Sequence, residues 1–148
     1  MERRDGLFDI IYKTISKGVI EMEPFMIKIE ELQPSQLYIS RKKLEKVQRW
    51  FTPTDPSSYN PIPIKKLDDR IIITDGHTRI YVAYLEAVDE IKVEWDIDDL
   101  DWDIYRICVD WCLEEGITTI SNLEGRLLES DQYQTLWIDR CQKIQQQT

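Results

Sequence analysis

One junction in the sequence constrains the fold more than any other feature. A strand-like apolar run at residues 70–74 leads into Asp75-Gly76-His77-Thr78-Arg79, and a helix-like apolar run follows at 80–85. This order predicts a strand, a tight turn and the N-terminus of a helix. Such a turn points unpaired backbone N–H groups and the positive end of the helix dipole at one place, which suits a phosphate or another anion.

The side chains of this turn are compatible with an anion site. Gly76 permits a positive φ and a close approach of the backbone, Thr78 offers a hydroxyl, and Arg79 offers bidentate donors. Asp75 carries a carboxylate that can hold Mg²⁺ or accept a proton, and His77 is the only histidine of the chain. A structural interpretation stays open, in which Asp75 caps the helix and Arg79 is a solvated side chain.

Length and composition predict a single folded domain over residues 1–148, because 148 residues with 42% hydrophobic content can bury a core. No apolar run approaches the roughly 18 residues of a membrane span, and residues 1–5 lack the apolar region of a signal peptide. The three cysteines cannot all pair, so we expect a reducing, cytoplasmic environment. Cys108 and Cys112 are interpreted as core residues, because no second histidine or Cys-x-x-Cys completes a zinc set.

The charge of the chain is distributed unevenly. The net charge is −9, made up of −2 at residues 1–39, +4 at 40–80 and −11 at 81–148. The acidic total argues against direct binding of nucleic acid or of an anionic membrane. The positive segment contains the turn, and the acidic C-terminal half could engage a basic protein.

Periodicity and punctuation predict the remaining elements. They are a helix at 6–17, a strand at 24–31, a helix capped by Ser40 and ending at 51, a hairpin of 62–67 with 70–74, a strand at 90–95, a largely buried helix at 101–115 and a final helix from about 130. Residues 52–63, rich in Pro and Ser, are expected to form a loop. The segment 97–148 is therefore expected to be a helical C-terminal extension.

A second cationic feature lies at the start of the helix that Ser40 caps. Arg41, Lys42 and Lys43 occupy its first turn, where positive charge opposes the helix dipole at a cost of roughly 0.3–1 kcal/mol each. Two interpretations remain open. Either the cluster, with Lys43, meets an anion in three dimensions, or it is a solvated surface patch that Glu45 partly offsets.

The pattern at residues 25–95 resembles the ParB/sulfiredoxin-like fold. The matching motifs are Leu32-Gln33-Pro34, Asn60-Pro61-Ile62-Pro63-Ile64, Ile73-Thr74 with the turn up to Arg79, and Ala83. The resemblance covers about half of the chain, and the whole chain also looks like a family of uncharacterised bacterial proteins. It implies an α+β fold, with a small mixed sheet packed by helices at 24–96 and the helical extension after it.

Within this superfamily the turn is most similar to that of the free-serine kinases. They carry Asp-Gly-His-His-Arg, which this chain matches except at Thr78. ParB proteins carry Gly-Glu-Arg-Arg, which Gly76 and Arg79 match, whereas sulfiredoxins place a reactive Cys where His77 stands. The resemblance implies binding of ATP, ADP or another nucleotide with Mg²⁺ by residues 76–79, with Asp75 as metal ligand or base in transfer to a small hydroxyl-bearing molecule such as a free amino acid. Lys43, from the cationic first turn of the helix that Ser40 caps, is a further candidate for binding this ligand.

One departure from the kinase pattern leads to an alternative. The further catalytic Glu of these kinases is expected near Pro34-Ser35-Gln36, and Gln36 stands in its place; a neutral amide cannot take a proton. Glu30 or Glu31 is the candidate substitute. The alternative is a non-catalytic module that senses a nucleotide or engages a protein, similar to a partitioning regulator without its own DNA-binding domain.

Overall fold

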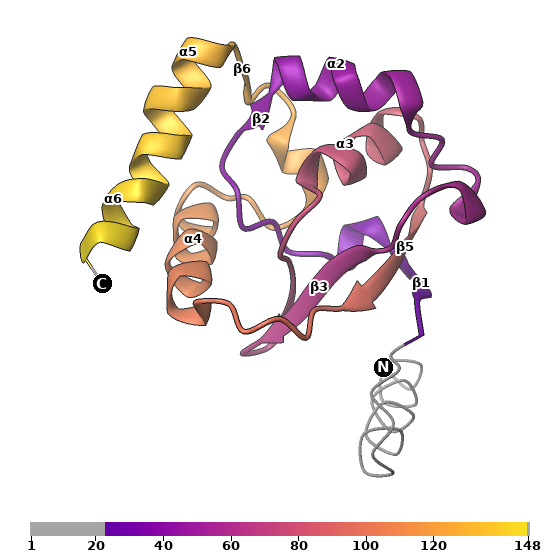
Figure 1. Ribbon diagram of the computed structural model, residues 1–148, viewed down its shortest axis with the longest axis horizontal. Helices are drawn as coiled ribbons and strands as arrows, with labels where there is room; N and C mark the ends of the chain where they lie inside the picture. Colours follow the sequence, from indigo (N-terminus) through magenta and orange to yellow (C-terminus); the bar gives the residue numbers. More distant parts are fainter. Residues whose placement is uncertain (1–22, 148) are drawn as a thin grey trace, which may run out of the picture.

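The structure is a computed structural model that describes residues 23–147. Its main sheet has four strands of mixed direction in the order β1-β5-β3-β4 (Figure 1). β1 (Phe25–Lys28) is antiparallel to β5 (Glu90–Trp95), which is parallel to β3 (Ile62–Leu67). β3 is antiparallel to β4 (Arg70–Ile73). The predicted α+β class with a small mixed sheet is therefore confirmed.

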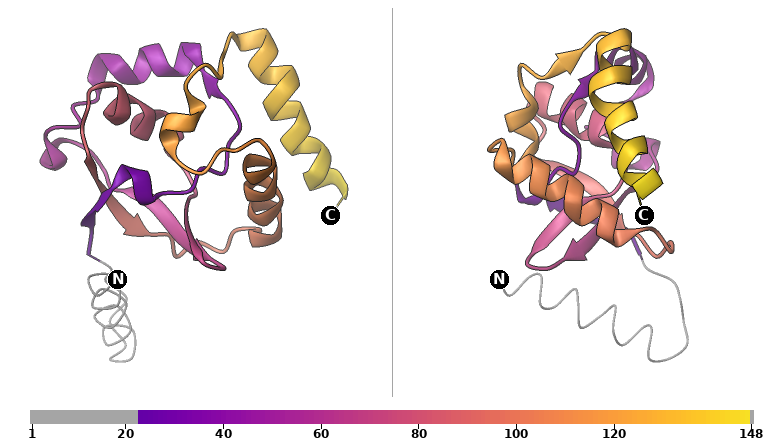
Figure 2. Two further views of the ribbon diagram at one scale, coloured as in Figure 1. Left: turned by 180° about the vertical axis from the view of Figure 1, so that it is seen from behind. Right: turned by 90° about the vertical axis from the view of Figure 1, so that its left-hand side faces the viewer.

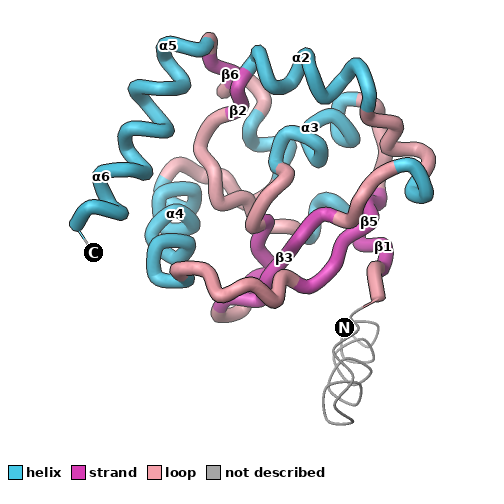
Figure 3. Tube along the Cα trace, viewed as in Figure 1, coloured by secondary structure: helices cyan, strands magenta, loops and turns pink. Residues whose placement is uncertain are grey.

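Helices and short segments complete the fold (Figure 3). The helices are α2 (Arg41–Trp50), α3 (His77–Leu85), α4 (Trp102–Glu114), α5 (Ser130–Tyr133) and α6 (Asp139–Gln147), with the π-helical turn η4 (Gln134–Ile138) between the last two. Three 3-10 turns are η1 (Ile29–Glu31), η2 (Pro56–Ser58) and η3 (Ile120–Leu123). A second, parallel pair joins β2 (Ile39–Ser40) to β6 (Leu127–Leu128).

Most predicted elements are confirmed, with two differences and one element untested. The predicted strand at 24–31 ends at Lys28, because the chain turns into η1, where the Leu32 N–H donates to the Ile29 carbonyl at 3.2 Å. The prediction that α4 is largely buried is wrong. α4 lies at the outside of the molecule, where Cys108, Val109 and Cys112 are its buried residues (Figure 2). The predicted helix at 6–17 lies outside the described residues.

The core joins the sheet to the C-terminal segment. α3 lies between α2 and the sheet (Figure 1), and most of its residues are buried. Ile117, Ile120, Leu123 and Trp137 belong to the same buried cluster as the strands. The segment at 97–147 therefore completes the main core. Among the described residues, none of the helices has both the length and the apolar composition that crossing a membrane requires.

The segment after η1 attaches to the edge of the sheet and leads to the turn. The Gln33 N–H donates to the Ile71 carbonyl at 2.8 Å, and the Ile73 N–H donates to the Gln33 carbonyl at 3.0 Å. Two residues later, the Ser35 hydroxyl donates to the Ile73 carbonyl at 2.7 Å. These bonds extend the pairing of β4 and bring Ser35 beside the junction of β4 and α3.

Candidate functional site: the turn between β4 and α3

The turn at residues 75–79 has the backbone that the sequence predicts. Gly76 is the N-cap of α3 and has a φ of 90°, in the left-handed region that favours glycine. The Asp75 carboxylate accepts the Gly76 N–H at 2.8 Å, which is not the bond to the second or third helical residue that defines a cap. No side chain of the described residues caps α3, so the N–H groups of its first turn lack a side-chain acceptor.

Arg79 folds back over this turn. Its Nη1 donates to the Asn60 carbonyl at 2.8 Å, and its Nη2 lies 3.1 Å from the position that a Cβ on residue 76 would occupy. Burial lowers the pKa of the Arg79 guanidinium, while the charges of Asp75 and Tyr59 act in the opposite direction. The absence of a side chain at Gly76 thus lets a half-buried cation lie close to the N-terminus of α3.

His77 and Thr78 have side chains that point into the core rather than to the surface. They are 5% and 3% exposed. The Nε2 of His77 accepts the Ser35 N–H at 2.9 Å, and burial, together with the charge of Lys43, lowers the pKa of His77 to about 3. The neutral imidazole therefore positions the turn against residues 33–35. The predicted role of the Thr78 hydroxyl in ligand binding is not supported, because that side chain is buried. Binding at His77 and Thr78 stays a prediction that relies on their backbone N–H groups.

Asp75 is exposed and lines a cavity of about 840 Å³. The other acidic residues of its lining are Glu23, Glu94, Asp96 and Asp98. In its wall the Thr74 hydroxyl donates to Asp96 at 2.7 Å, and the Tyr105 hydroxyl donates to the Thr74 carbonyl at 3.0 Å. No three His, Cys, Asp or Glu side chains of residues 23–147 converge as a metal site, whereas a Mg²⁺ that arrives with a nucleotide takes most of its ligands from phosphate and water.

The structure does not bring the remaining predicted residues into this cavity. Lys43 is exposed at the start of α2, close enough for its charge to act on His77, and it lines a different cavity of about 620 Å³ between α2 and the C-terminal helix. Glu30 is exposed in η1, and none of the recorded contacts within residues 23–147 joins it to the turn. The prediction that Glu30 substitutes for the missing catalytic Glu thus has no support in these contacts.

Gln36 has a structural partner that sequence reasoning did not find. Its Nε2 donates to the Tyr38 carbonyl at 2.7 Å and to the Tyr133 hydroxyl at 2.9 Å. The carbonyl of Asn60, which holds Arg79, was also missed. No local sequence pattern reveals these two partners. The first is a backbone carbonyl in a loop, and the second is a tyrosine 97 positions after Gln36.

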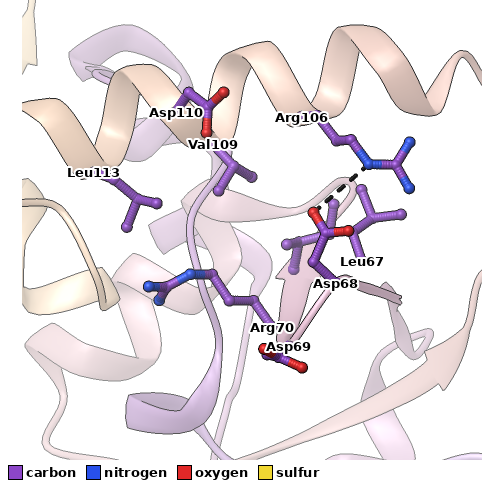
Figure 4. A pocket seen from close by; sticks show the side chains of 9 residues that line it. Leu67, Asp68, Asp69, Arg70, Arg106, Val109, Asp110 and Leu113 are labelled. Atoms are coloured by element: carbon purple, nitrogen blue, oxygen red, sulfur yellow. Dashed lines mark ion pairs between the residues drawn. The ribbon is translucent and has the colours of Figure 1, made fainter.

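A further cavity, of about 430 Å³, lies between the β3–β4 hairpin and α4 (Figure 4). Its charged lining mixes both signs, because Arg70 and Arg106 stand beside Asp68, Asp69 and Asp110. Arg106 pairs with Asp68 at 3.6 Å. This mixture offers no preference for an anion.

Comparisons with known proteins give a likeness among solved structures. No family model matches the chain, and no curated protein matches it. Among solved structures it is similar to the protein Atu1540 from Agrobacterium tumefaciens, with 18% sequence identity and a TM-score of 0.44. The likeness covers 68% of this chain and 52% of that protein, so the chain spans about half of that protein's length.

Proposed function

We propose that this chain is a nucleotide- or phosphate-binding protein of the ParB/sulfiredoxin-like type, and that the phosphate binds at residues 75–79. The observation that carries the proposal is Arg79, a half-buried guanidinium held across a left-handed glycine at a helix N-terminus. Burial of this cation costs free energy that an opposite charge would offset. A phosphate at this place would accept from Arg79 and from the N–H groups of α3.

The proposed chemistry is phosphoryl transfer to a small hydroxyl-bearing molecule. Asp75 is the exposed carboxylate beside Arg79, and it opens on the 840 Å³ cavity. A magnesium ion bound with the nucleotide would spread the charge of the transferred group. In this mechanism Asp75 either holds that ion or accepts the proton of the hydroxyl, while Arg79 and the backbone of the turn hold the phosphates in place.

A sensor that binds a nucleotide without turnover is the second candidate. It is favoured by the amide of Gln36, whose Nε2 already donates to the Tyr38 carbonyl and the Tyr133 hydroxyl. Glu30, the predicted substitute, is exposed without a recorded contact to the turn. Asp75 would then be the one carboxylate within residues 75–79, with no second carboxylate to assist it. In this sensor the acidic C-terminal half of the chain would engage a basic protein.

The first test is a thermal shift. ATP, ADP or CTP with Mg²⁺ is expected to raise the melting temperature, because a ligand at ~100 times its dissociation constant stabilises the folded state by roughly 2.7 kcal/mol. Inorganic phosphate serves as a weaker ligand of the same site, and sodium chloride at matched ionic strength serves as the control. If none of the nucleotides nor phosphate shifts the melting temperature beyond the salt control, the proposed anion site is absent.

The second test separates the enzyme from the sensor. A kinase is expected to phosphorylate at least one member of a panel of free hydroxy amino acids, and Asp75→Asn should abolish turnover while nucleotide still binds. Gln36→Glu should raise activity if the chain is a weakened kinase. The matched control is Gln36→Met. Gln36→Glu and Gln36→Met both remove the donor to the Tyr38 carbonyl, but only Gln36→Glu adds a carboxylate. Nucleotide binding with no product from wild type or Gln36→Glu would favour the sensor.

A further inference from the structure

α4 and the C-terminal helical segment pack against each other through aromatic and cationic side chains. Trp111 of α4 meets Trp137 of η4, with ring centroids 6.1 Å apart at an interplanar angle of 78°. The guanidinium of Arg140 in α6 lies 3.8 Å from the centroid of Trp111. The two helical segments lie side by side in both figures that show the ribbon (Figure 1, Figure 2).

Two of the three thiols meet at this contact. Cys108 lies one turn before Trp111 in α4, and Cys141, in α6, lies one turn after Trp137. The two thiols are close enough for each to shift the pKa of the other. Cys108 is buried, whereas Cys141 is partly exposed and lines the 620 Å³ cavity beside α2. An oxidant in solution can therefore reach Cys141 through the cavity.

The surroundings distinguish the roles of the two thiols. The interaction with Cys108 lowers the pKa of Cys141, burial opposes this, and the positive charge of Arg140 lowers it further. The same interaction and burial raise the pKa of Cys108. Because Cys141 alone of the two is partly exposed at the cavity, Cys141 is the thiol that meets the oxidant, and the buried Cys108 is its resolving partner.

The third thiol has a different environment. The Sγ of Cys112 donates to the Gln36 carbonyl at 3.6 Å and is fully buried. Burial raises the pKa of Cys112 to about 12, which makes its thiolate rare. Cys112 therefore provides an internal control on the same helix as Cys108.

We propose that Cys108 and Cys141 form a site of reversible oxidative modification, at which a hydroperoxide closes a disulfide between α4 and α6. The Cys141 thiolate attacks the peroxide, an S–O bond forms, the O–O bond breaks, and the leaving oxygen takes up a proton. The Cys108 sulfur then attacks Cys141, the S–S bond forms, and the hydroxyl leaves as water with the proton of Cys108. The two thiols lose two electrons, and the peroxide gains them.

The disulfide changes what the C-terminal segment can do. It connects α6, one wall of the cavity beside α2, to α4, which packs against the β3–β4 hairpin. The same segment carries Tyr133, which accepts from Gln36. Oxidation therefore adds a covalent bond between α4 and α6 in the packed arrangement that the C-terminal segment already has with free thiols.

The test counts thiols in the full-length protein treated with hydrogen peroxide and then with an alkylating reagent. The wild type is expected to fall from three free thiols to one, with a Cys108–Cys141 peptide in the non-reducing mass map, and to regain all three with dithiothreitol. Cys112→Ser should fall from two to none. Cys108→Ala and Cys141→Ser should each keep two free thiols. In Cys108→Ala the remaining Cys141 can still be oxidised to a sulfenic acid, which lowers the count by that fraction.

A melting experiment provides an independent measurement. The oxidised wild type is expected to melt roughly 5–10 °C above the reduced protein, because the bond closes a loop of the unfolded chain. The proposal is overturned if the wild type keeps three thiols, if a pair other than Cys108 and Cys141 forms, or if peroxide gives dimers instead of an internal bond. The wild-type peptide map decides this even where a variant does not fold.

Discussion

Between pH 6.5 and pH 4.5 the protein is expected to lose about 2–3 kcal/mol of its free energy of unfolding through His77 alone. Burial lowers the pKa of His77 from 6.5 to about 3 in the folded protein, whereas in the unfolded chain the imidazole titrates at its ordinary value. In that interval the unfolded state binds a proton that the folded state does not. The stabilisation is therefore complete above pH 6.5 and is lost as the pH falls towards 3.

The measurement is urea unfolding, followed by tryptophan fluorescence from pH 7 to pH 4.5, for wild type and His77→Gln. Glutamine keeps an acceptor for the Ser35 N–H without titrating, and the carboxylates common to both proteins cancel. The wild-type curve should be steeper by up to about 1.4 kcal/mol per pH unit. Equal slopes would contradict the expectation. NMR titration of this single histidine gives a second check, since its signals should not shift above pH 4.

Arg79→Ala is expected to weaken the binding of nucleotide by about 30-fold to several thousand-fold, the equivalent of 2–5 kcal/mol for losing one partner of a buried charge pair. The side chain contributes charge-assisted donors to the bound phosphate. The folded protein without ligand should change little, because the one hydrogen bond of the Arg79 side chain to residues 23–147 is to the Asn60 carbonyl, and Arg79 takes no part in the apolar core. Isothermal titration calorimetry measures the affinity, and thermal melting measures the stability.

Two further variants make this test specific. Arg49→Ala removes the same charge from an exposed position at the end of α2 and should leave the affinity unchanged. Arg79→Lys keeps the charge but loses the bidentate fork, so its affinity should be intermediate. Unaltered binding by Arg79→Ala would place the ligand elsewhere, and unfolding of that variant without ligand would assign Arg79 a structural role.

The elements set by local patterns were predictable from the sequence. The hairpin of β3 and β4 and the strand β5 follow the alternation of apolar residues, and the positive φ of Gly76 follows from its place between a strand and a helix. Such signals need no knowledge of distant partners. They located the turn and its backbone, although not the direction of each side chain.

The side-chain directions depend on partners far away in the chain. His77 was predicted to bind a ligand, but its Nε2 bonds to Ser35, which lies 42 positions earlier on a segment that joins the edge of β4. Gln36 and Tyr133 meet across an even longer separation. A histidine in a polar turn has the same local pattern whether it faces solvent or core, because tertiary contacts decide between the two.

The parallel pairing of β2 with β6 also affects folding during synthesis of the chain. Ile39 pairs with Leu127, 88 positions later, and its N–H donates to the Arg126 carbonyl at 3.1 Å. At translation rates of 5–20 residues per second, this interval lasts roughly 4–18 s. During that time Ile39, fully buried in the finished fold, has no strand to pair with. Newborn chains are thus expected to depend on the arrival of β6 for protection from aggregation.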